Sequence, residues 1–244
     1  FGVSPKGDLL LMAKTSKKAV PKHVVIIPDG NRRWAKSRGL APIEGHKKGL
    51  ETALKVVRGS RDLGVKVLTL WGFSTENWER KPVEVRYLMQ IYAEFFRKYF
   101  KELAREGVRF NWLGRRDRVP KILKGVLEMI EKRTAANKNY ILNICIDYGG
   151  HDELLRAIKK IVAKKIVPFK IDEQVVAAHL DTAGLPDPDL LIRTSGEHRT
   201  SGMLPWQTAY SEIYFSEVFF PDFSVVELKR AIADFARRQR RFGQ

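Results

Sequence analysis

In this chain, short apolar runs alternate with longer segments whose apolar residues have a helical period. The first run, HVVIIP at 23–28, is continuously apolar and bounded by turn residues, as expected for a strand buried on both faces. Further strands are predicted at 65–73, 108–114, 140–150, 189–196 and 212–215. The clearest helix is 83–106, where apolar residues recur at spacings of three and four. Other helices are predicted at 43–62, about 118–136, 151–165, 172–180 and about 224–240.

This alternation predicts an α/β protein with a parallel sheet and helices packed on it. No linker, composition break or repeat interrupts the pattern, so residues 23–244 are expected to form a single domain. Residues 1–22 carry five lysines and one acidic residue, and they are predicted to form a basic arm. In such a sheet ligands bind beyond the carboxyl ends of the strands, so functional residues are expected there.

Charge and composition narrow the possible partners. Lys and Arg total 45 against 28 Asp and Glu, which gives a net charge of +17. This balance suits nucleic acid, anionic lipid headgroups or phosphorylated substrates, although a solvated basic surface would give the same total. No apolar stretch approaches the roughly 18 residues that span a bilayer. The single cysteine, Cys145, excludes an internal disulfide and favours a reducing, cytoplasmic location.

The first predicted strand ends in an unusual set of polar residues. They are Asp29, Gly30, Asn31, Arg32, Arg33 and Trp34. Gly30 allows close approach of a ligand, Asn31 can cap a helix, and the helix amino terminus with the two arginines suits phosphate oxygens. Asp29 would repel the same anion unless a divalent cation lay between them, which indicates a magnesium-bound diphosphate. For Asp-Gly-Asn alone, a helix cap with a surface Arg–Asp pair is the commoner explanation.

Two other strand ends repeat this chemistry. After the strand at 65–73, one loop gathers Ser74, Glu76, Asn77, Trp78 and Arg80, a signal that is weak by itself. After the strand at 189–196, Arg193 and Arg199 flank hydroxyls and glycines in a pattern typical of an oxyanion site. Glu212 opens an apolar strand, where a carboxylate is costly unless paired or metal-bound. Three such loops at the predicted ligand-binding edge are hard to attribute to chance.

Several common site motifs are absent from the sequence. It contains no G-x-x-x-x-G-K-[ST], no G-x-G-x-x-G after a strand, no G-x-S-x-G and no H-E-x-x-H. Nucleotide binding of the standard kinds is therefore unsupported. His198 remains a candidate ligand or acid–base group, and His46, after Gly45, a candidate phosphate contact.

In these residues and their order, the chain resembles a cis-prenyltransferase of the undecaprenyl diphosphate synthase family. The matching stretches are HVVIIPDGNRRWA, EGHKKG, TLWGFSTENWER, NICIDYGG, DLLIRTSGEHRTSGMLPWQTAYSEIYF and FARRQRRFG. They follow the family order over nearly everything after residue 22. The resemblance implies a single domain with a six-stranded, largely parallel sheet, flanking helices, a hydrophobic tunnel and a homodimer.

The resemblance also implies a reaction. Isopentenyl diphosphate would add repeatedly to an allylic diphosphate such as farnesyl or geranylgeranyl diphosphate, with Mg²⁺ as cofactor. The product would be a cis-polyprenyl diphosphate, a precursor of a lipid carrier for glycan synthesis. This chemistry makes peripheral contact with a membrane possible and needs no nucleic acid.

The family's functional residues are carried over at matching positions. Asp29 would hold Mg²⁺ on the allylic diphosphate, with Glu212 and His198 helping to place metal across the dimer interface. Ser74 and Asn77 would position the reacting groups. The expected substrate-binding residues are Gly30, Asn31, Arg32, Arg33, Trp34, His46, Phe73, Trp78, Arg80, Arg193, Arg199, Ser201, Arg241 and Gly243. Arg193, Arg199 and Ser201 would bind isopentenyl diphosphate, and Arg241 and Gly243 would reach the partner's active site.

One position departs from the family pattern. Many bacterial members carry an arginine where this chain has Pro42, so one phosphate contact is either absent or supplied elsewhere, with Arg32 as a candidate. Two alternatives stay open: a non-catalytic or short-chain member of the same family, and a basic nucleic-acid-binding protein. The second alternative rests on charge alone, because no aromatic residues are interleaved on a basic face. Product length is not readable from motifs.

Overall fold

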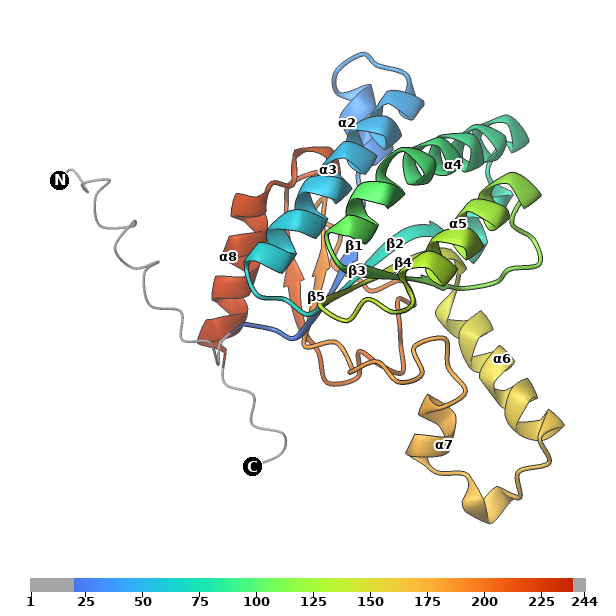
Figure 1. The fold of residues 1–244 in the computed structure, drawn as a ribbon. Helices are drawn as coiled ribbons and strands as arrows, with labels where there is room; N and C mark the ends of the chain where they lie inside the picture. The colour runs from blue at the N-terminus through green and yellow to red at the C-terminus, as the bar shows by residue number, and fades with distance from the viewer. Residues whose placement is uncertain (1–19, 239–244) are drawn as a thin grey trace.

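A computed structural model describes residues 20–238 of the chain (Figure 1). The strands are β1 (His23–Ile27), β2 (Val67–Ser74), β3 (Val108–Leu113), β4 (Tyr140–Tyr148), β5 (Leu190–Arg193) and β6 (Glu212–Phe215). The α-helices are α2 (Asn31–Lys36), α3 (Pro42–Asp62), α4 (Pro82–Arg105), α5 (Lys121–Thr134), α6 (Gly150–Ala163), α7 (Glu173–Ala177) and α8 (Val225–Arg237). Short 3₁₀ turns are η3 (Thr75–Glu79), η4 (Pro168–Lys170) and η5 (Phe220–Asp222).

The six strands form one sheet in the order β3-β4-β2-β1-β5-β6, and every neighbouring pair is parallel. The predicted α/β class and parallel six-stranded sheet are therefore confirmed. The connection from β1 runs to β2 on one side, whereas β5 pairs with β1 on the other. The strand order thus reverses around β1, and ligands of such sheets bind at this kind of crevice.

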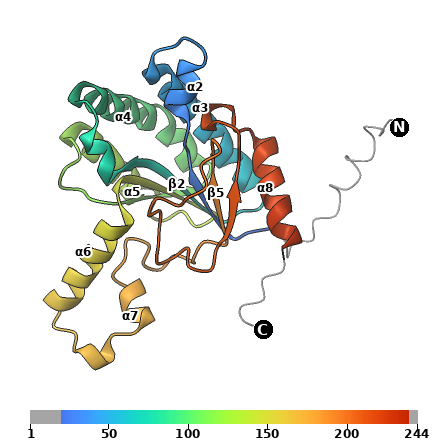
Figure 2. The same ribbon diagram turned by 180° about the vertical axis from the view of Figure 1, so that it is seen from behind.

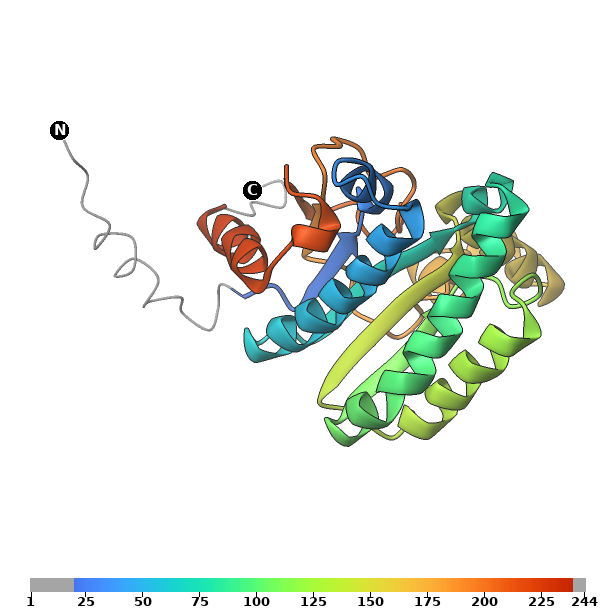
Figure 3. The same cartoon turned by 90° about the horizontal axis from the view of Figure 1, so that it is seen from above.

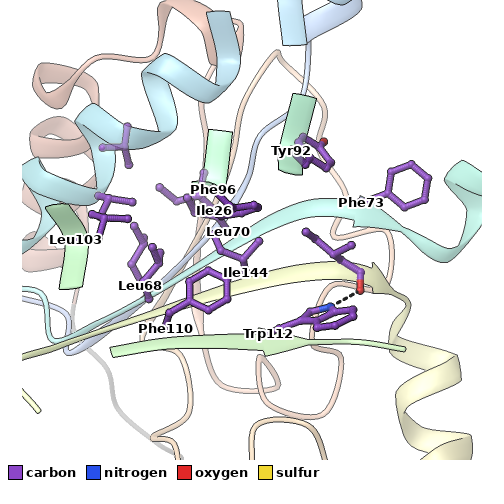
Figure 4. Close-up of a cluster of buried hydrophobic side chains, with 14 of the residues drawn as sticks. Ile26, Leu68, Leu70, Phe73, Tyr92, Phe96, Leu103, Phe110, Trp112 and Ile144 are labelled. Atoms are coloured by element: carbon purple, nitrogen blue, oxygen red, sulfur yellow. Dashed lines mark hydrogen bonds between the residues drawn. The ribbon is translucent and has the colours of Figure 1, made fainter. Parts of the chain in front are cut away.

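The main core lies between one face of the sheet and the helices α3, α4, α5 and α8 (Figure 3). Side chains of α4 point toward the strands, and Phe96 belongs to the same buried cluster as Ile26, Leu70 and Ile144 (Figure 4). Burying each such apolar side chain contributes about 1.5–3 kcal/mol relative to leaving it in water. A smaller cluster that includes Val25, Cys145 and Leu191 lies on the opposite face. Long connections pass that face, and α6 and α7 extend away from the sheet (Figure 2).

The long helix α4 follows from its apolar period. Pro82 stands at its first turn, where proline removes no helical hydrogen bond. Its buried residues include Leu88, Tyr92 and Phe96, on the face directed at the sheet. The helix ends at Arg105, and Gly107 follows with a φ of 75°, which only glycine adopts without strain.

Two irregularities interrupt the pairing of β2 with β4 near its carboxyl end. Trp71 pairs with Cys145 and Phe73 with Ile146, so Gly72 is an extra residue on β2. Ser74 then pairs with Tyr148, so Asp147 is an extra residue on β4. The two bulges compensate each other and turn the side chains at the end of β2.

Some local predictions differ from the structure. Asn31 is the first residue of α2 and not its cap; Gly30 occupies the cap position, and no side chain caps the helix. The strand predicted at 189–196 ends at Arg193, because Ser195 and Gly196 adopt positive φ values. The helix predicted at 172–180 is the short α7, which covers five residues.

Candidate active site

The carboxyl ends of β1 and β5 bring Asp29 and Arg193 together. Ile27 pairs with Arg193 in the sheet, and Arg193 Nη2 donates to Asp29 Oδ2 at 2.8 Å. Arg193 is 5% exposed, so its charge is nearly removed from water and needs this carboxylate. The backbone of Asp29 is fixed by Thr194, whose Oγ1 accepts from Asp29 N and donates to Asp29 O, each at 2.8 Å. Sheet register therefore positions a carboxylate–guanidinium pair at the ligand-binding edge.

A close backbone approach completes this end of the site. Gly30 has a φ of 97°, and a Cβ on it would lie 2.6 Å from Phe219 Cδ1 and 2.8 Å from Ser195 Cβ. Only glycine fits that space. Ser195 itself has a φ of 74°, which is unusual for a residue with a side chain. Residues held in such conformations gather at ligand sites, where surrounding contacts impose them.

Arginines and a bridging glutamate extend the cluster outward. Arg33 Nη1 lies 2.8 Å from Glu197 Oε1, and Arg33 Nη2 donates to Ser195 Oγ at 2.5 Å. Glu197 Oε2 also accepts from Arg199 Nη1 at 2.5 Å, and this hydrogen bond lowers the pKa of Glu197. Arg193 Nη1 donates to Ser201 Oγ and to the carbonyl oxygen of Arg199, each at 2.7 Å. One connected network thus joins Asp29 to all three predicted residues of the 193–201 loop.

Helix α3 supplies a second wall through its glycines. A Cβ on Gly45 would lie 2.0 Å from the Asn31 carbonyl oxygen, and one on Gly49 would lie 2.3 Å from Asn31 Oδ1. The two glycines therefore allow α2 to pack directly on α3. Asn31 Oδ1 and His46 Nε2 are both buried without a hydrogen-bond partner. Unpaired buried polar atoms beside a cavity indicate a place for a polar ligand.

His46 is neutral at neutral pH. Burial, assisted by the positive charges of Arg80 and Arg32, lowers the pKa of His46 to about 4. An anion bound between Arg80 and Arg32 would offset their positive charges and so raise the pKa of His46. Arg32 lies 3.9 Å from Glu84, and Arg80 lies 3.4 Å from the same carboxylate. Pro42, the position where the family pattern has arginine, is the first residue of α3.

The loop after β2 forms the third side. Ser74 and Asn77 form a capping box: Asn77 Oδ1 accepts from Ser74 N at 3.1 Å, and the Ser74 side chain accepts from the Asn77 amide. Phe73 packs edge-on against Trp78 with ring centroids 5.1 Å apart. Tyr92 OH donates to the Gly72 carbonyl oxygen at 2.8 Å, and burial raises the pKa of Tyr92 to about 12.

These three strand ends surround the mouth of a cavity of about 1080 Å³. The polar residues that line it include Asp29, Asn31, Arg32, Arg33, His46, Ser74, Glu76, Asn77, Arg80, Arg193 and Ser201. The cavity continues between α3, α4 and the sheet, where its walls are apolar. These wall residues include Leu50, Leu54, Val57, Tyr92, Phe95, Phe96, Leu103, Leu142 and Ile144. From Tyr92 to Leu103 the wall follows α4 for roughly 16 Å, at the rise of an α-helix.

Other predicted residues lie elsewhere. Trp34 and Trp78 are not part of the cavity lining; Trp34 Nε1 donates to Asp222 Oδ1 at 2.8 Å, and Trp78 supports Phe73 from behind. Glu212 Oε2 accepts from Arg238 Nη1 at 2.9 Å, which supplies the partner that an apolar strand requires. His198 stacks on Phe215 with centroids 4.7 Å apart. Arg241 and Gly243 lie outside the described residues.

The metal prediction can be compared with the donors present. Among residues 20–238, no three His, Cys, Asp or Glu side chains form a cluster that could hold a metal ion. Mg²⁺ characteristically needs only one or two carboxylates, because substrate phosphates and water complete its shell. The carboxylate of Asp29 is 28% exposed, and Asp29 lines the cavity. This one carboxylate fits Mg²⁺ that arrives with a diphosphate.

Sequence reasoning missed several supporting residues. Thr194, Glu197 and Tyr92 contact the site without having been assigned to it. Thr194 and Glu197 stand in the same loop as Arg193 and Arg199, and only this position in the sequence could have indicated that they belong to the site. Tyr92 belongs to the apolar face of α4, where core packing was the expected role.

Fold and cavity together define an α/β protein with a parallel sheet and a cavity that has a polar mouth and an apolar interior. Comparisons with known proteins agree. A family model described as putative undecaprenyl diphosphate synthase matches residues 27–243. The isoprenyl transferase of Aquifex pyrophilus is 47% identical over 92% of this chain and 96% of its own length. That of Streptococcus thermophilus strain CNRZ 1066 is 46% identical, over 92% and 93% of the two chains.

Solved structures show the same relationship. Lavandulyl diphosphate synthase from Lavandula x intermedia, in complex with dimethylallyl diphosphate, superposes with a TM-score of 0.91 at 38% identity, over 93% of this chain and 100% of the other. A probable undecaprenyl diphosphate synthase from Campylobacter jejuni gives 0.77 at 30% identity, over 92% and 99%. The chain belongs to the undecaprenyl diphosphate synthase family and is a prenyltransferase enzyme.

Proposed function

We propose that this enzyme condenses isopentenyl diphosphate repeatedly with an allylic diphosphate primer and releases a cis-polyprenyl diphosphate. The observation that carries the proposal is that one cavity combines an arginine-rich mouth with an apolar interior. A growing isoprenoid has the same division, with an anionic diphosphate at one end and a hydrocarbon chain at the other. Burial of that chain supplies binding free energy in proportion to its apolar area.

The residues at the mouth divide into two groups under this proposal. Gly30, Asn31, Arg32, Arg33 and His46 hold the diphosphate of the allylic substrate, next to Asp29. The diphosphate of isopentenyl diphosphate binds Arg193, Arg199 and Ser201. The hydrogen bonds that join Arg193 to Asp29 and Ser201 support two neighbouring anion sites. Neighbouring sites make attack of one substrate on the other effectively intramolecular.

In the reaction, the allylic C–O bond breaks and its electron pair leaves with the diphosphate. The double-bond electrons of isopentenyl diphosphate form the new C–C bond, which leaves a positive charge on C3 of that substrate. A proton is then lost from C2 to the released diphosphate or water, and the C2–H electrons form the new double bond. Arginine guanidiniums stabilise the charge of the departing diphosphate. Asn77 and Ser74 border the reacting groups, while Phe73, supported by Trp78, excludes water from one side. Mg²⁺ bound at Asp29 would neutralise part of the charge on the leaving group.

Glu212 and His198 lie outside the cavity of their own chain, so we propose that they act across a homodimer interface. Exposed apolar side chains support a dimer. Leu155, Ile158 and Val162 lie on one face of α6 and are 57%, 54% and 69% exposed. A surface stripe of this kind typically marks a protein–protein contact.

We also propose that the enzyme works in the cytoplasm at a membrane surface. The described residues contain no helix long and apolar enough to cross a bilayer. Support comes from the net charge of +17, which favours anionic headgroups, and from the apolar product, which must be delivered to lipid.

A second candidate is the synthesis of a short product. It is favoured by the likeness to lavandulyl diphosphate synthase, a structure that holds dimethylallyl diphosphate. The cavity volume favours the longer product, because about 1080 Å³ exceeds the roughly 300–1,000 Å³ of sites for drug-sized ligands.

One assay tests the proposal. The protein is incubated with radiolabelled isopentenyl diphosphate, Mg²⁺ and a series of allylic primers, and products are sized by chromatography. Label in a ladder of extractable products longer than the primer is expected. Label in a single product one unit longer would support the short-chain alternative, and no incorporation with any primer would contradict both.

A further inference from the structure

Asp147 is a buried charge that none of the proposed catalytic or binding roles uses. It is 0% exposed and is the extra residue of the bulge near the carboxyl end of β4. Its φ is 54°, in the left-handed region, which aspartate adopts more readily than most residues with a side chain. Backbone contacts hold it there: Arg115 N donates to the Asp147 carbonyl oxygen at 3.0 Å.

The two oxygens of the Asp147 carboxylate accept hydrogen bonds from residues of two different loops. Arg118 Nε donates to Oδ2 at 2.9 Å, and Arg118 Nη2 donates to Oδ1 at 2.5 Å. Trp78 Nε1 donates to Oδ1 at 2.8 Å. The Arg118 guanidinium also lies 5.8 Å from the centroid of the Trp78 ring. A bidentate pair and an indole N–H therefore meet on one carboxylate, which excludes most other orientations of Trp78.

Trp78 connects this buried cluster to the cavity. It belongs to η3, between Asn77 and Arg80, and both of these residues line the cavity mouth. Its ring packs against Phe73, which lines the cavity as well. Without this anchor, the loop would keep the Ser74–Asn77 capping box, the backbone bond from Arg80 N to the Asn77 carbonyl oxygen at 3.2 Å and the Arg80–Glu84 ion pair at 3.4 Å. None of these contacts fixes the orientation of the Trp78 ring, so the loop would open more easily.

Stability alone gives little reason to bury the Asp147 carboxylate. Its side chain is 0% exposed whereas that of Arg118 is 39% exposed, so the carboxylate gives up its water for a partner that stays partly in water. A fixed geometry is what a bidentate pair supplies. We propose that Asp147 is a positioning residue that, through Arg118 and Trp78, holds the loop 74–80 so that Asn77 and Arg80 face the diphosphates. The part of this that concerns diphosphates rests on the proposed function.

The chain contains a matched control for this cluster. Glu131 receives Arg116 Nη1 at 2.7 Å and Nη2 at 3.0 Å, and the Arg116 guanidinium lies 4.8 Å from the Trp112 ring centroid. This second cluster likewise consists of a carboxylate, an arginine and a tryptophan. Neither Glu131 nor Arg116 lines the cavity. Glu131→Gln therefore removes a comparable charge pair away from the loop 74–80.

The test compares Asp147→Asn with Glu131→Gln by hydrogen exchange and by steady-state kinetics. In Asp147→Asn the amides of Ser74, Asn77 and Arg80 should exchange about tenfold faster, because local opening becomes easier. The KM for the diphosphate substrates should rise about tenfold, with a smaller change in kcat. Glu131→Gln should leave both readouts unchanged. Unchanged exchange in Asp147→Asn, or an equal change in both variants, would overturn the proposal.

Trp78→Phe keeps the proposal testable if Asp147→Asn does not fold. This variant keeps an aromatic ring against Phe73 and both Arg118 bonds, and removes only the indole donor. Faster exchange at 74–80 supports the anchor, and unchanged exchange overturns it. The exchange readout needs no substrate. If the wild-type chain incorporates no isopentenyl diphosphate, the proposed function fails while exchange still decides the positioning role.

Discussion

Arg193 and Asp29, 164 positions apart in the chain, form an ion pair of 2.8 Å at neighbouring strand ends. Arg193 is almost fully buried, whereas the Asp29 side chain is 28% exposed toward the cavity. The pair therefore fixes one carboxylate oxygen and leaves the group accessible. It also links the two proposed diphosphate sites before any substrate binds, which reduces the reorganisation needed during reaction.

Asp29→Asn should lower kcat by at least about 100-fold with little change in folding, because charge stabilisation at the leaving group is lost. Asparagine retains an oxygen that accepts from Arg193, which alanine would not. The measurement is incorporation of labelled isopentenyl diphosphate across a Mg²⁺ titration, with circular dichroism as the folding control. Near-normal, Mg²⁺-dependent turnover would contradict the proposed role.

Arg199→Ala should raise the KM for isopentenyl diphosphate roughly tenfold, the usual effect of losing a hydrogen bond to a charged group. Arg230→Ala is the matched control: its side chain is 60% exposed against 59% for Arg199, and each is paired with a nearby glutamate. Initial rates at varied isopentenyl diphosphate separate the two variants. An equal KM in both would remove Arg199 from the substrate site.

Gly30→Ala should destabilise the fold by about 1–3 kcal/mol, because a methyl group meets Phe219 and Ser195 in a backbone conformation that alanine disfavours. Gly125→Ala should have the opposite effect and raise the free energy of unfolding. Gly125 lies inside α5 with no atom within 4 Å of an added Cβ, so alanine should stabilise the helix by about 0.5–1 kcal/mol. Urea unfolding of the two variants checks both signs, and equal shifts would refute the packing argument.

Stability should fall as the pH is lowered from about 6.5 to 4. Burial of His23 lowers its pKa from 6.5 to about 4, so the unfolded chain binds this proton first. The loss of unfolding free energy begins below pH 6.5 and continues until His23 is also protonated in the folded protein, near pH 4. It amounts to about 3 kcal/mol. His46 acts in the same direction.

His23→Gln isolates the contribution of His23 from that of His46 and the carboxylates. His23 bonds Pro186 O and Thr69 Oγ1 at 2.7 and 2.8 Å, and an amide can replace both contacts. Between pH 7 and pH 4, wild type should therefore lose more unfolding free energy than the variant does. A difference that stays constant with pH would show that His23 does not titrate on unfolding.

Ile158→Glu should convert a dimer to a monomer, because a charge replaces an apolar side chain in the middle of the exposed face of α6. Ile122→Glu on α5 is the control, with 50% exposure against 54% for Ile158. Size-exclusion chromatography with light scattering measures both variants. A monomeric wild type, or dissociation of both variants, would contradict the assignment of this face.

The sheet and the position of the site were predictable because both follow from local pattern. Continuous apolar runs such as 23–28 indicate buried parallel strands, and such strands collect their following residues at one edge. What the pattern could not show is which distant groups meet. Strand order and register decide these contacts. Examples are the bonds of Thr194 to Asp29, the bridge made by Glu197 and the Trp78–Asp147 contact. Asn31 was expected as a cap because local propensity ignores the space that Gly45 and Gly49 leave for it.

The bulge at Gly72 adds one residue to β2, and the bulge at Asp147 adds one residue to β4. The pairing beyond the bulges stays in register only because both strands carry the extra residue. Deletion of one of these residues alone would shift the pairing beyond it by one position and direct Ser74 and Tyr148 to opposite faces of the sheet. Deletion of both would restore the pairing, although it would also remove the Trp78 anchor. Related chains should therefore gain or lose these two residues together, and such paired changes in length can be sought directly in the genes of the family.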